Sequence, residues 1–241
     1  MLSARGAIYS LLLAILLAPA SALWAEDSDA AYPKPSPVPV SWELKFVHSD
    51  PKRIVVNIPG AMAPTAYWYI MYSVVNLGES PDAGTAAADN APGSEKSTSD
   101  ENPKERIFYP VFTLRTHEGK LIPANDGIHP AVFEAIKQEE RNKYLEDPTQ
   151  MGGKILIGQD QERDSVAIWQ EPSQRMGEFT IFASGMWGET APAKDADGHA
   201  LKNADGDDIL LHKTLLMQYH VDGDQFHFTP VRKLVEEFIM R

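Results

Sequence analysis

The segment that most constrains the fold of this chain is AYWYIMYSVVNL at residues 66–77. It is dense in aromatic and β-branched residues, which are enriched in strands. Both of its alternate faces are apolar, so a strand formed here has to be buried on both sides. The segment therefore predicts a central strand of a sheet that is covered on both faces.

Shorter strand patterns surround this segment, with turn residues between them. Residues 42–47 and 53–58 predict a hairpin, and residues 106–122 predict two strands joined by the turn HEGK at 117–120. Helical patterns are confined to residues 130–146 and to the C-terminal segment. This order of elements predicts a mainly β fold, an antiparallel β-sandwich with one inserted helix and a C-terminal helix.

The strand and turn chemistry resembles that of known exported bacterial proteins. An aromatic strand that ends in VNLGE at 75–79, and a later FTLRTHEGK at 112–120, are similar to immunoglobulin-like domains of such proteins. The whole mature chain, including KTLLMQY at 213–219, resembles a group of uncharacterised exported proteins from planctomycete-type bacteria. The resemblance implies an immunoglobulin-like β-sandwich and an export route, and it implies no activity.

Residues 1–25 have the pattern of a cleavable export signal. The apolar run at 11–18 is too short to cross the ~30 Å hydrocarbon core of a bilayer. Small residues suited to a signal peptidase follow, and cleavage is expected between Ala22 and Ala25. The alternative is an uncleaved membrane helix. The signal predicts a periplasmic or secreted protein with no membrane span after cleavage.

The composition limits both the chemistry and the partners of the chain. There is no cysteine, which excludes disulfides and thiolate sites, so stability has to come from a hydrophobic core. With 22 basic and 34 acidic residues, the formal net charge is −12. A surface this acidic repels nucleic acid and anionic lipid, so neither is expected as a partner.

Two polar stretches divide the mature chain. Residues 26–40 contain prolines at alternate positions and predict an extended tether. Residues 79–105 are rich in small, polar and charged residues without periodicity, and predict a mobile, disordered insertion. The β-sandwich domain is expected to cover residues 41–241, with this insertion inside it.

The C-terminal segment at residues 229–241 predicts a helix. Thr229 and Pro230 suit an N-cap and a first helical turn, and apolar residues follow at helical spacing. The helix is expected to dock on the domain or on a partner protein. Its apolar stripe, the candidate partner-binding surface, consists of Val231, Leu234, Val235, Phe238 and Ile239.

Residues 210–228 predict a hairpin through the turn DG at 222–223, in which Tyr219 pairs with Phe226. This register places His220 and His227 on a polar face, where they could share a metal or transfer a proton. A catalytic zinc needs a third protein ligand, and Asp222 or Asp224 is the local source. The alternative is a solvated polar face.

A near-repeat, DADGHALK at 195–202 and NADGDDIL at 203–210, places carboxylates beside glycines. Calcium needs oxygen ligands around a sharp turn, but the position of the glycine and the lack of a later glutamate depart from the EF-hand pattern. The alternative is two consecutive polar turns, and no other cofactor is expected. The candidate calcium ligands are Asp195, Asp197, Asp205 and Asp207.

No motif names a reaction, since the sequence contains neither a G-x-S-x-G elbow nor a phosphate-binding loop. The sequence therefore predicts a non-catalytic binding or assembly module of the cell envelope, whose partner is an envelope protein or a polysaccharide. One alternative is a carbohydrate-binding accessory domain, with Trp187 exposed near a turn as the sugar-stacking residue against a default of core packing. Another is a metal-dependent hydrolase.

Overall fold

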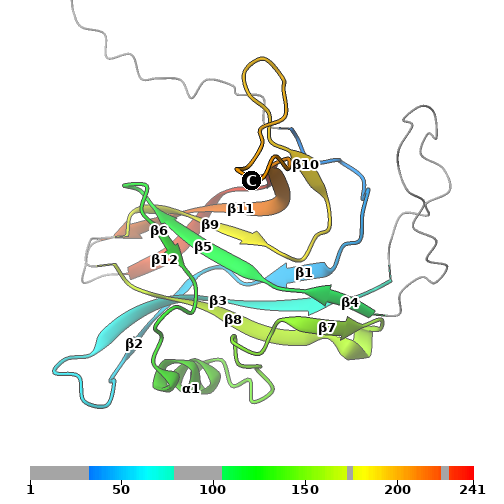
Figure 1. Ribbon diagram of the computed structural model, residues 1–241. Coiled ribbons are helices and arrows are strands. Elements are labelled where there is room, and N and C mark those ends of the chain that lie inside the picture. The colour runs from blue at the N-terminus through cyan, green and yellow to red at the C-terminus, as the bar shows by residue number, and fades with distance from the viewer. Residues whose placement is uncertain (1–32, 79–104, 173–175, 224–227) are drawn as a thin grey trace, which may run out of the picture. The chain divides into compact units, whose positions relative to one another are not determined.

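The computed structural model describes residues 33–78, 105–172, 176–223 and 228–241. These residues form an antiparallel β-sandwich with a single α-helix (Figure 1). The strands are β1 (Lys45–His48), β2 (Lys52–Val56), β3 (Thr65–Val75), β4 (Glu105–Phe108), β5 (Val111–Thr116), β6 (Leu121–Pro123), β7 (Gly153–Leu156), β8 (Arg163–Gln170), β9 (Glu178–Ser184), β10 (Thr190–Pro192), β11 (Leu210–Gly223) and β12 (Phe228–Met240). The mainly β prediction is confirmed.

The four-stranded sheet is built around β3, the strand predicted from residues 66–77. β8 pairs with one side of β3, while β1 and β2 pair with successive parts of its other side. The predicted hairpin between β1 and β2 is wrong. The N–H of Ser49 donates to the carbonyl of Met71 at 2.9 Å, so the chain between β1 and β2 continues along β3 instead of turning back.

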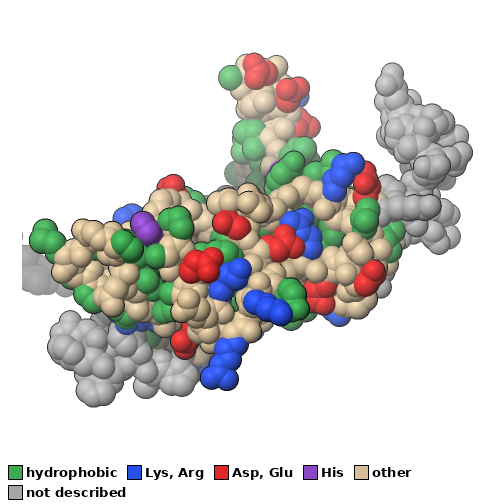
Figure 2. Space-filling model, turned by 90° about the horizontal axis from the view of Figure 1, so that it is seen from below, with side chains coloured by type: hydrophobic (Ala, Val, Ile, Leu, Met, Phe, Trp, Pro, Cys, Tyr) green, Lys and Arg blue, Asp and Glu red, His purple; other side chains and the backbone are tan. Residues whose placement is uncertain are grey.

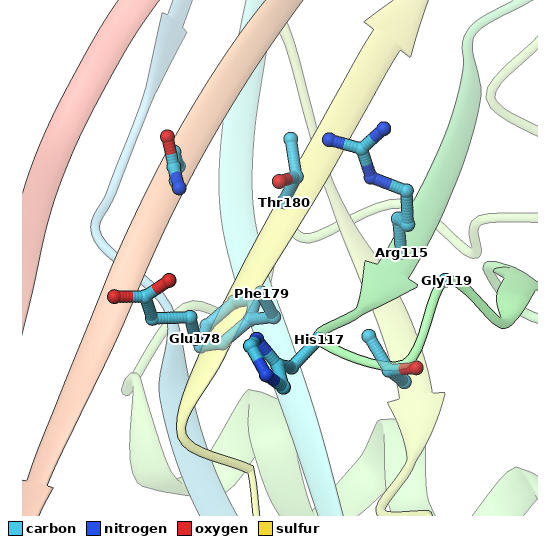
Figure 3. Close-up of a pocket in the computed structure, with 8 residues that line it drawn as sticks. Arg115, His117, Gly119, Glu178, Phe179 and Thr180 are labelled. Atoms are coloured by element: carbon cyan, nitrogen blue, oxygen red, sulfur yellow. The ribbon is translucent and has the colours of Figure 1, made fainter. Parts of the chain in front are cut away.

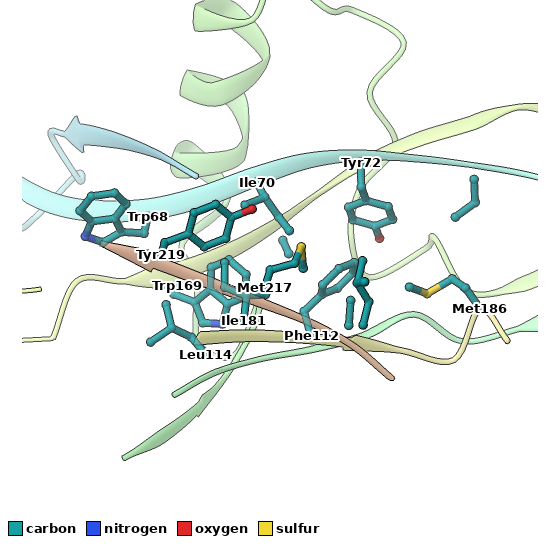
Figure 4. Packing of buried hydrophobic residues seen from close by; sticks show 14 of the residues in the cluster. Trp68, Ile70, Tyr72, Phe112, Leu114, Trp169, Ile181, Met186, Met217 and Tyr219 are labelled. Carbon is teal, nitrogen blue, oxygen red and sulfur yellow. The ribbon is translucent and has the colours of Figure 1, made fainter. Parts of the chain in front are cut away.

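β3 is buried on both faces, as its sequence predicts. On one face Trp68, Ile70 and Tyr72 enter the main core between the two sheets (Figure 4). On the other face Tyr67 and Tyr69 pack in a second core beneath the helix. The two-sided apolar pattern therefore reflects a sheet that lies between a second sheet and a helix.

The helix α1 (Pro130–Glu139) begins where predicted and is shorter than the predicted span of 130–146. Its end is tied to the sheet, because the Tyr69 hydroxyl donates to Glu140 Oε1 at 2.7 Å and Lys52 Nζ donates to the same carboxylate at 2.8 Å. Burial works to raise the pKa of Glu140, but these two hydrogen bonds outweigh it and lower the pKa. Arg141, with φ of 53°, then leaves helical geometry.

The six-stranded sheet has the order β10-β11-β9-β5-β6. Strand β12 pairs with the side of β11 that is opposite β9. Alternate residues of its central strands, such as Ile181 and Met217, face the main core and are fully buried. The residues between them, such as Gln218, face away from the core on what we call the outer face. Figure 1 shows the two sheets as stacked layers, with β4 and β7 as a separate ribbon at one end.

The predicted C-terminal helix is wrong, because residues 228–240 form strand β12. The two-residue turn at 222–223 is also wrong, since Asp222 and Gly223 belong to β11. Tyr219 pairs with Lys233, and Phe226 lies outside the described residues. A β-bulge in β12 explains the misleading pattern, because an extra residue in a strand breaks its two-residue alternation.

Several sequence predictions fall partly or wholly outside the described residues. These are the export signal at 1–25 and the insertion at 79–105, of which Glu105 begins β4. Of the predicted tether, residues 33–40 are described, and the N–H of Ser36 donates to Glu189 Oε1 at 2.7 Å. None of the helices in the described part of the chain is long and apolar enough to cross a membrane.

Candidate functional site

A row of polar side chains crosses the outer face of the six-stranded sheet. Arg115 of β5 lies opposite Thr180 of β9, which lies opposite Gln218 of β11. These residues line a hollow of about 270 Å³ (Figure 3). The rest of its lining is Thr116, His117, Gly119, Glu178 and Phe179. The hollow is therefore assembled from three strands that are distant in the sequence.

The turn between β5 and β6 forms one wall of the hollow. The N–H of Gly119 donates to the carbonyl of Thr116 at 2.8 Å, and Gly119 has φ of 84°, a left-handed conformation that favours glycine. This turn carries His117. Figure 3 shows His117 and Glu178 at one end of the hollow and Arg115 with Thr180 at the other. The hollow thus has a cationic end and an end with an imidazole and a carboxylate.

Phe182 lies next to the hollow, on the same face of β9, and two arginines cover it. The guanidinium Cζ of Arg115 is 5.2 Å from the ring centroid, and that of Arg241 is 3.9 Å from it. Phe182 is consequently only 5% exposed although it faces away from the core. Burial lowers the pKa of Arg241, and the positive charge of Arg115 lowers it further. Two like charges are therefore held near each other on one ring.

His220 lies between two carboxylates beyond the far end of the hollow. Its Nε2 is 3.0 Å from Asp222 Oδ1, and its Nδ1 is 3.7 Å from Glu178 Oε1. Arg232 approaches the same aspartate at 4.0 Å. The predicted partner His227 and the candidate ligand Asp224 lie outside the described residues. Within the described part, the contacts of His220 are thus those of a charged surface network on the outer face.

The aspartate-rich near-repeat forms two matching turns on an arm of the chain. Asp195 Oδ1 accepts hydrogen bonds from the N–H groups of Asp197 and His199, at 3.0 and 2.8 Å. Asn203 Oδ1 accepts the equivalent bonds from Asp205 and Asp207, both at 2.9 Å. The four aspartates predicted as calcium ligands are therefore divided between two turns. Each half of the near-repeat forms a turn with the same pair of hydrogen bonds.

One group near these turns has ligand atoms close enough to share a metal ion. Ligand atoms of Asp195, Asp197 and His199 lie within 4.8 Å of one another, and all three residues are exposed. Asp195 is already engaged by the backbone of its own turn. Asp205 and Asp207 do not belong to this group. The hydrogen bonds of the near-repeat are those of two turns.

The expected exposure of Trp187 is wrong, because this residue is only 6% exposed. Its ring makes edge contacts with Phe46 and Phe238, with centroids 5.7 and 4.9 Å apart. The backbone of Trp187 bridges to that of Glu43, which draws the turn onto the sheet edge. Trp187 closes the core at the edge of β12, so neither face of its ring is open to a sugar.

The five residues of the predicted apolar stripe do not share one surface. Val231 and Phe238 lie opposite core-facing residues of β11 and face inward, whereas Val235 and Ile239 face outward. Leu234 is the extra residue at the bulge. Of the inward pair, Phe238 remains 41% exposed at the edge. The structure therefore presents these residues along the rim of a sheet and not along a helix.

The outer-face hollow carries no motif that the sequence alone would reveal. Arg115, Thr180 and Gln218 each come from a different strand, and only the register between strands places them in one row. The available signal is the alternation of polar residues within each strand, which marks an outward face without giving its neighbours. No family model, curated protein or solved structure matches this chain.

Proposed function

We propose that this protein is an exported, non-catalytic binding module of the cell envelope, with an immunoglobulin-like sandwich as its scaffold. The export signal predicted at residues 1–25 supports a place in the periplasm or outside the cell. The binding site in this proposal is the outer face of the six-stranded sheet. Its ligand is an envelope polysaccharide that carries carboxylate groups.

The pair of arginines on Phe182 is the observation that carries this proposal. The chain as a whole is acidic, and Figure 2 shows acidic and basic side chains interspersed on the face seen from below. Among the described residues, no acidic side chain lies within 4.0 Å of the guanidinium of Arg115 or Arg241. A guanidinium binds a carboxylate through two parallel hydrogen bonds. An anionic group on the ligand would neutralise this local positive charge.

The rest of the hollow suits a sugar chain with few charges. Thr180 and Gln218 provide a hydroxyl and an amide, which can hydrogen-bond sugar hydroxyls. Glu178 and Asp222 at the far end would repel a second carboxylate placed there. The proposal therefore favours a short segment with its carboxylate at the Arg115 end. Trp187 has no part in this binding, since its ring is buried.

The proposal is tested by titrating the purified protein with two saccharides of equal length, one carboxylated and one neutral. An oligogalacturonate and the matching neutral oligogalactoside serve as probes, followed by isothermal titration calorimetry. We expect the carboxylated probe to bind and Arg115→Gln to weaken it about tenfold or more, because a hydrogen bond to a charged group contributes about 1.5–3 kcal/mol.

The matched control is Lys45→Gln, which removes one positive charge from an exposed position on β1. It should leave the affinity within about twofold of the parent, because Lys45 belongs to the four-stranded sheet and does not line the hollow. Equal binding of the neutral and carboxylated probes would contradict the proposed ligand. Equal weakening by both substitutions would show that general charge, and not the pair on Phe182, attracts the probe.

A further inference from the structure

Strand β12 forms one edge of the six-stranded sheet. It pairs with β11 along its length, and no other strand in the described ranges pairs with it. The backbone N–H and C=O groups on its far side therefore have no strand partner there. A long edge of this kind is a template for a further strand. What it can accept depends on the side chains that line it.

The sequence along this edge is complementary to itself. Residues 231–238, VRKLVEEF, have two basic residues followed by two acidic ones, with apolar residues at both ends and in the middle. When two copies lie antiparallel and centred between Leu234 and Val235, unlike charges face each other and apolar residues face apolar ones. The facing pairs are Val231 with Phe238, Arg232 with Glu237, and Lys233 with Glu236.

Residues that face each other across antiparallel strands must also lie on the same face of the sheet. In a regular strand, positions 232 and 237 would lie on opposite faces. The bulge removes this conflict, because the register with β11 passes from Val235 to Lys233 and leaves Leu234 as an extra residue. Arg232 and Glu237 consequently both lie on the outer face, opposite His220 and Leu216.

The other facing pairs match in the same way. Lys233 and Glu236 lie opposite Tyr219 and Met217, which are buried in the core, so both charged residues project from the inner face. Lys233 Nζ already donates to Glu236 within one chain. A second copy would surround each of these two charges with opposite charge from both chains. The bulge thus lies at the centre of the symmetric pairing.

We infer that two copies of this chain associate through β12, antiparallel and related by a two-fold axis near Leu234 and Val235. The two six-stranded sheets then form one continuous sheet across the interface. The exposed apolar residues Leu234 and Val235, which are 39% and 37% exposed, become covered at its centre, and Phe238, which is 41% exposed, becomes covered at each end. This inference does not rest on the proposed ligand, because no residue of β12 is among those that line the hollow.

The order of charges also selects this pairing over others. Charged residues on an edge strand ordinarily prevent association, because a foreign strand leaves them unmatched. A parallel copy in register would place Arg232 against Arg232 and Glu237 against Glu237. Only the antiparallel arrangement converts the repulsion into attraction, which is how specificity by charge pattern operates. The partner that fits this edge is therefore a second copy.

Sedimentation velocity on the purified protein, with charge reversal at the outer pair, tests this inference. We expect the parent to reach twice the single-chain mass as its concentration rises to about 100 µM, a range suited to a small interface. Arg232→Glu and Glu237→Arg should each remain single chains, because like charges then face each other. The double variant R232E/E237R should associate again.

Mixing the two single variants gives the sharpest outcome. Arg232→Glu carries two acidic residues and Glu237→Arg two basic ones, so an equimolar mixture should form a mixed pair although neither associates alone. Circular dichroism confirms that each variant is folded, and Arg115→Gln, in the ligand hollow, should associate as the parent does. A parent that stays a single chain at every concentration would overturn the inference. So would single variants that associate normally, or a mixture that does not pair.

Discussion

The two faces of the six-stranded sheet are made by the same strands and differ in what holds their side chains. On the inner face, Ile181 and Met217 are fully buried in the core between the sheets. On the outer face, Phe182 is nearly as buried, but charged side chains cover it instead of apolar ones. Apolar packing accounts for these two inner-face residues. The outer face has an arrangement that packing does not require.

The largest expected effect concerns Lys213, a strongly buried lysine of the inner face. Lys213 Nζ lies 2.6 Å from Glu43 and 3.3 Å from Glu189, and its side chain is 6% exposed. Lys213→Ala should lower the free energy of unfolding by about 4 kcal/mol, because it leaves two carboxylates without their shared partner. Urea denaturation measures the loss.

Lys202 provides the matched control, because its ion pair with Asp208 is exposed. Lys202→Ala should cost less than about 1 kcal/mol, as is usual for exposed ion pairs. If both substitutions cost the same, the buried cluster contributes no more than a surface pair, and the inner face would not differ from the outer one in this respect.

The next largest difference in stability is expected between a substitution in the core and one on the outer face. Ile181→Ala should cost about 3 kcal/mol in urea denaturation, since it leaves a cavity in the main core. On the same strand, Glu178 lies on the outer face with a side chain that is 46% exposed. Glu178→Ala should change stability by less than about 0.5 kcal/mol. Similar losses would mean that both faces are packed structural surfaces.

A smaller effect is expected where the inner face reaches solvent at β12. A hydrogen bond from Lys233 lowers the pKa of Glu236 below 4.5 despite partial burial, and nearby His48 contributes. Because folding lowers this pKa, the stabilisation is present above about pH 4.5 and is lost as the pH falls through the lowered value. The urea midpoint of the parent should therefore exceed that of Glu236→Gln at neutral pH. The difference between the two midpoints should become smaller below pH 4.5.

When Lys233→Met is added to both proteins, the difference between their urea midpoints at neutral pH should become smaller. The substitution removes the hydrogen bond that is the main cause of the lowered pKa of Glu236. Denaturation curves at several pH values between about 3 and 7 measure it. If the difference in urea midpoint between the parent and Glu236→Gln increases as the pH falls, the protonated form of Glu236 is the stabilising one. The rim of the inner face would then lack the ion pair described for it.

The sequence predicted the parts of the fold in which local pattern and burial agree. Residues 66–77 are apolar on both faces because β3 is covered on both sides. The turn at 117–120 follows from its own residues, and β5 and β6 pair around it. In these elements the local preference and the tertiary environment demand the same structure.

The predictions failed where tertiary contacts override the local pattern. The bulge at Leu234 makes the apolar spacing of β12 resemble that of a helix. Trp187 lies between glycines as an exposed turn residue would, yet the backbone bridge to Glu43 draws it into the core. The outer-face row could not be predicted, because the register of three strands brings Arg115 to Thr180 and Gln218.

The most direct test of the account follows the arginine side chains themselves. In a ¹H–¹⁵N spectrum, the Nε–H signals of Arg115 and Arg241 are observed while the carboxylated oligosaccharide is added, with assignments from Arg115→Gln and Arg241→Gln. We expect these two signals to shift together and saturate, while that of Arg163, held by Glu146 at 2.6 Å, stays in place. If the Arg115 and Arg241 signals do not move while the probe binds, the outer face is not the ligand site.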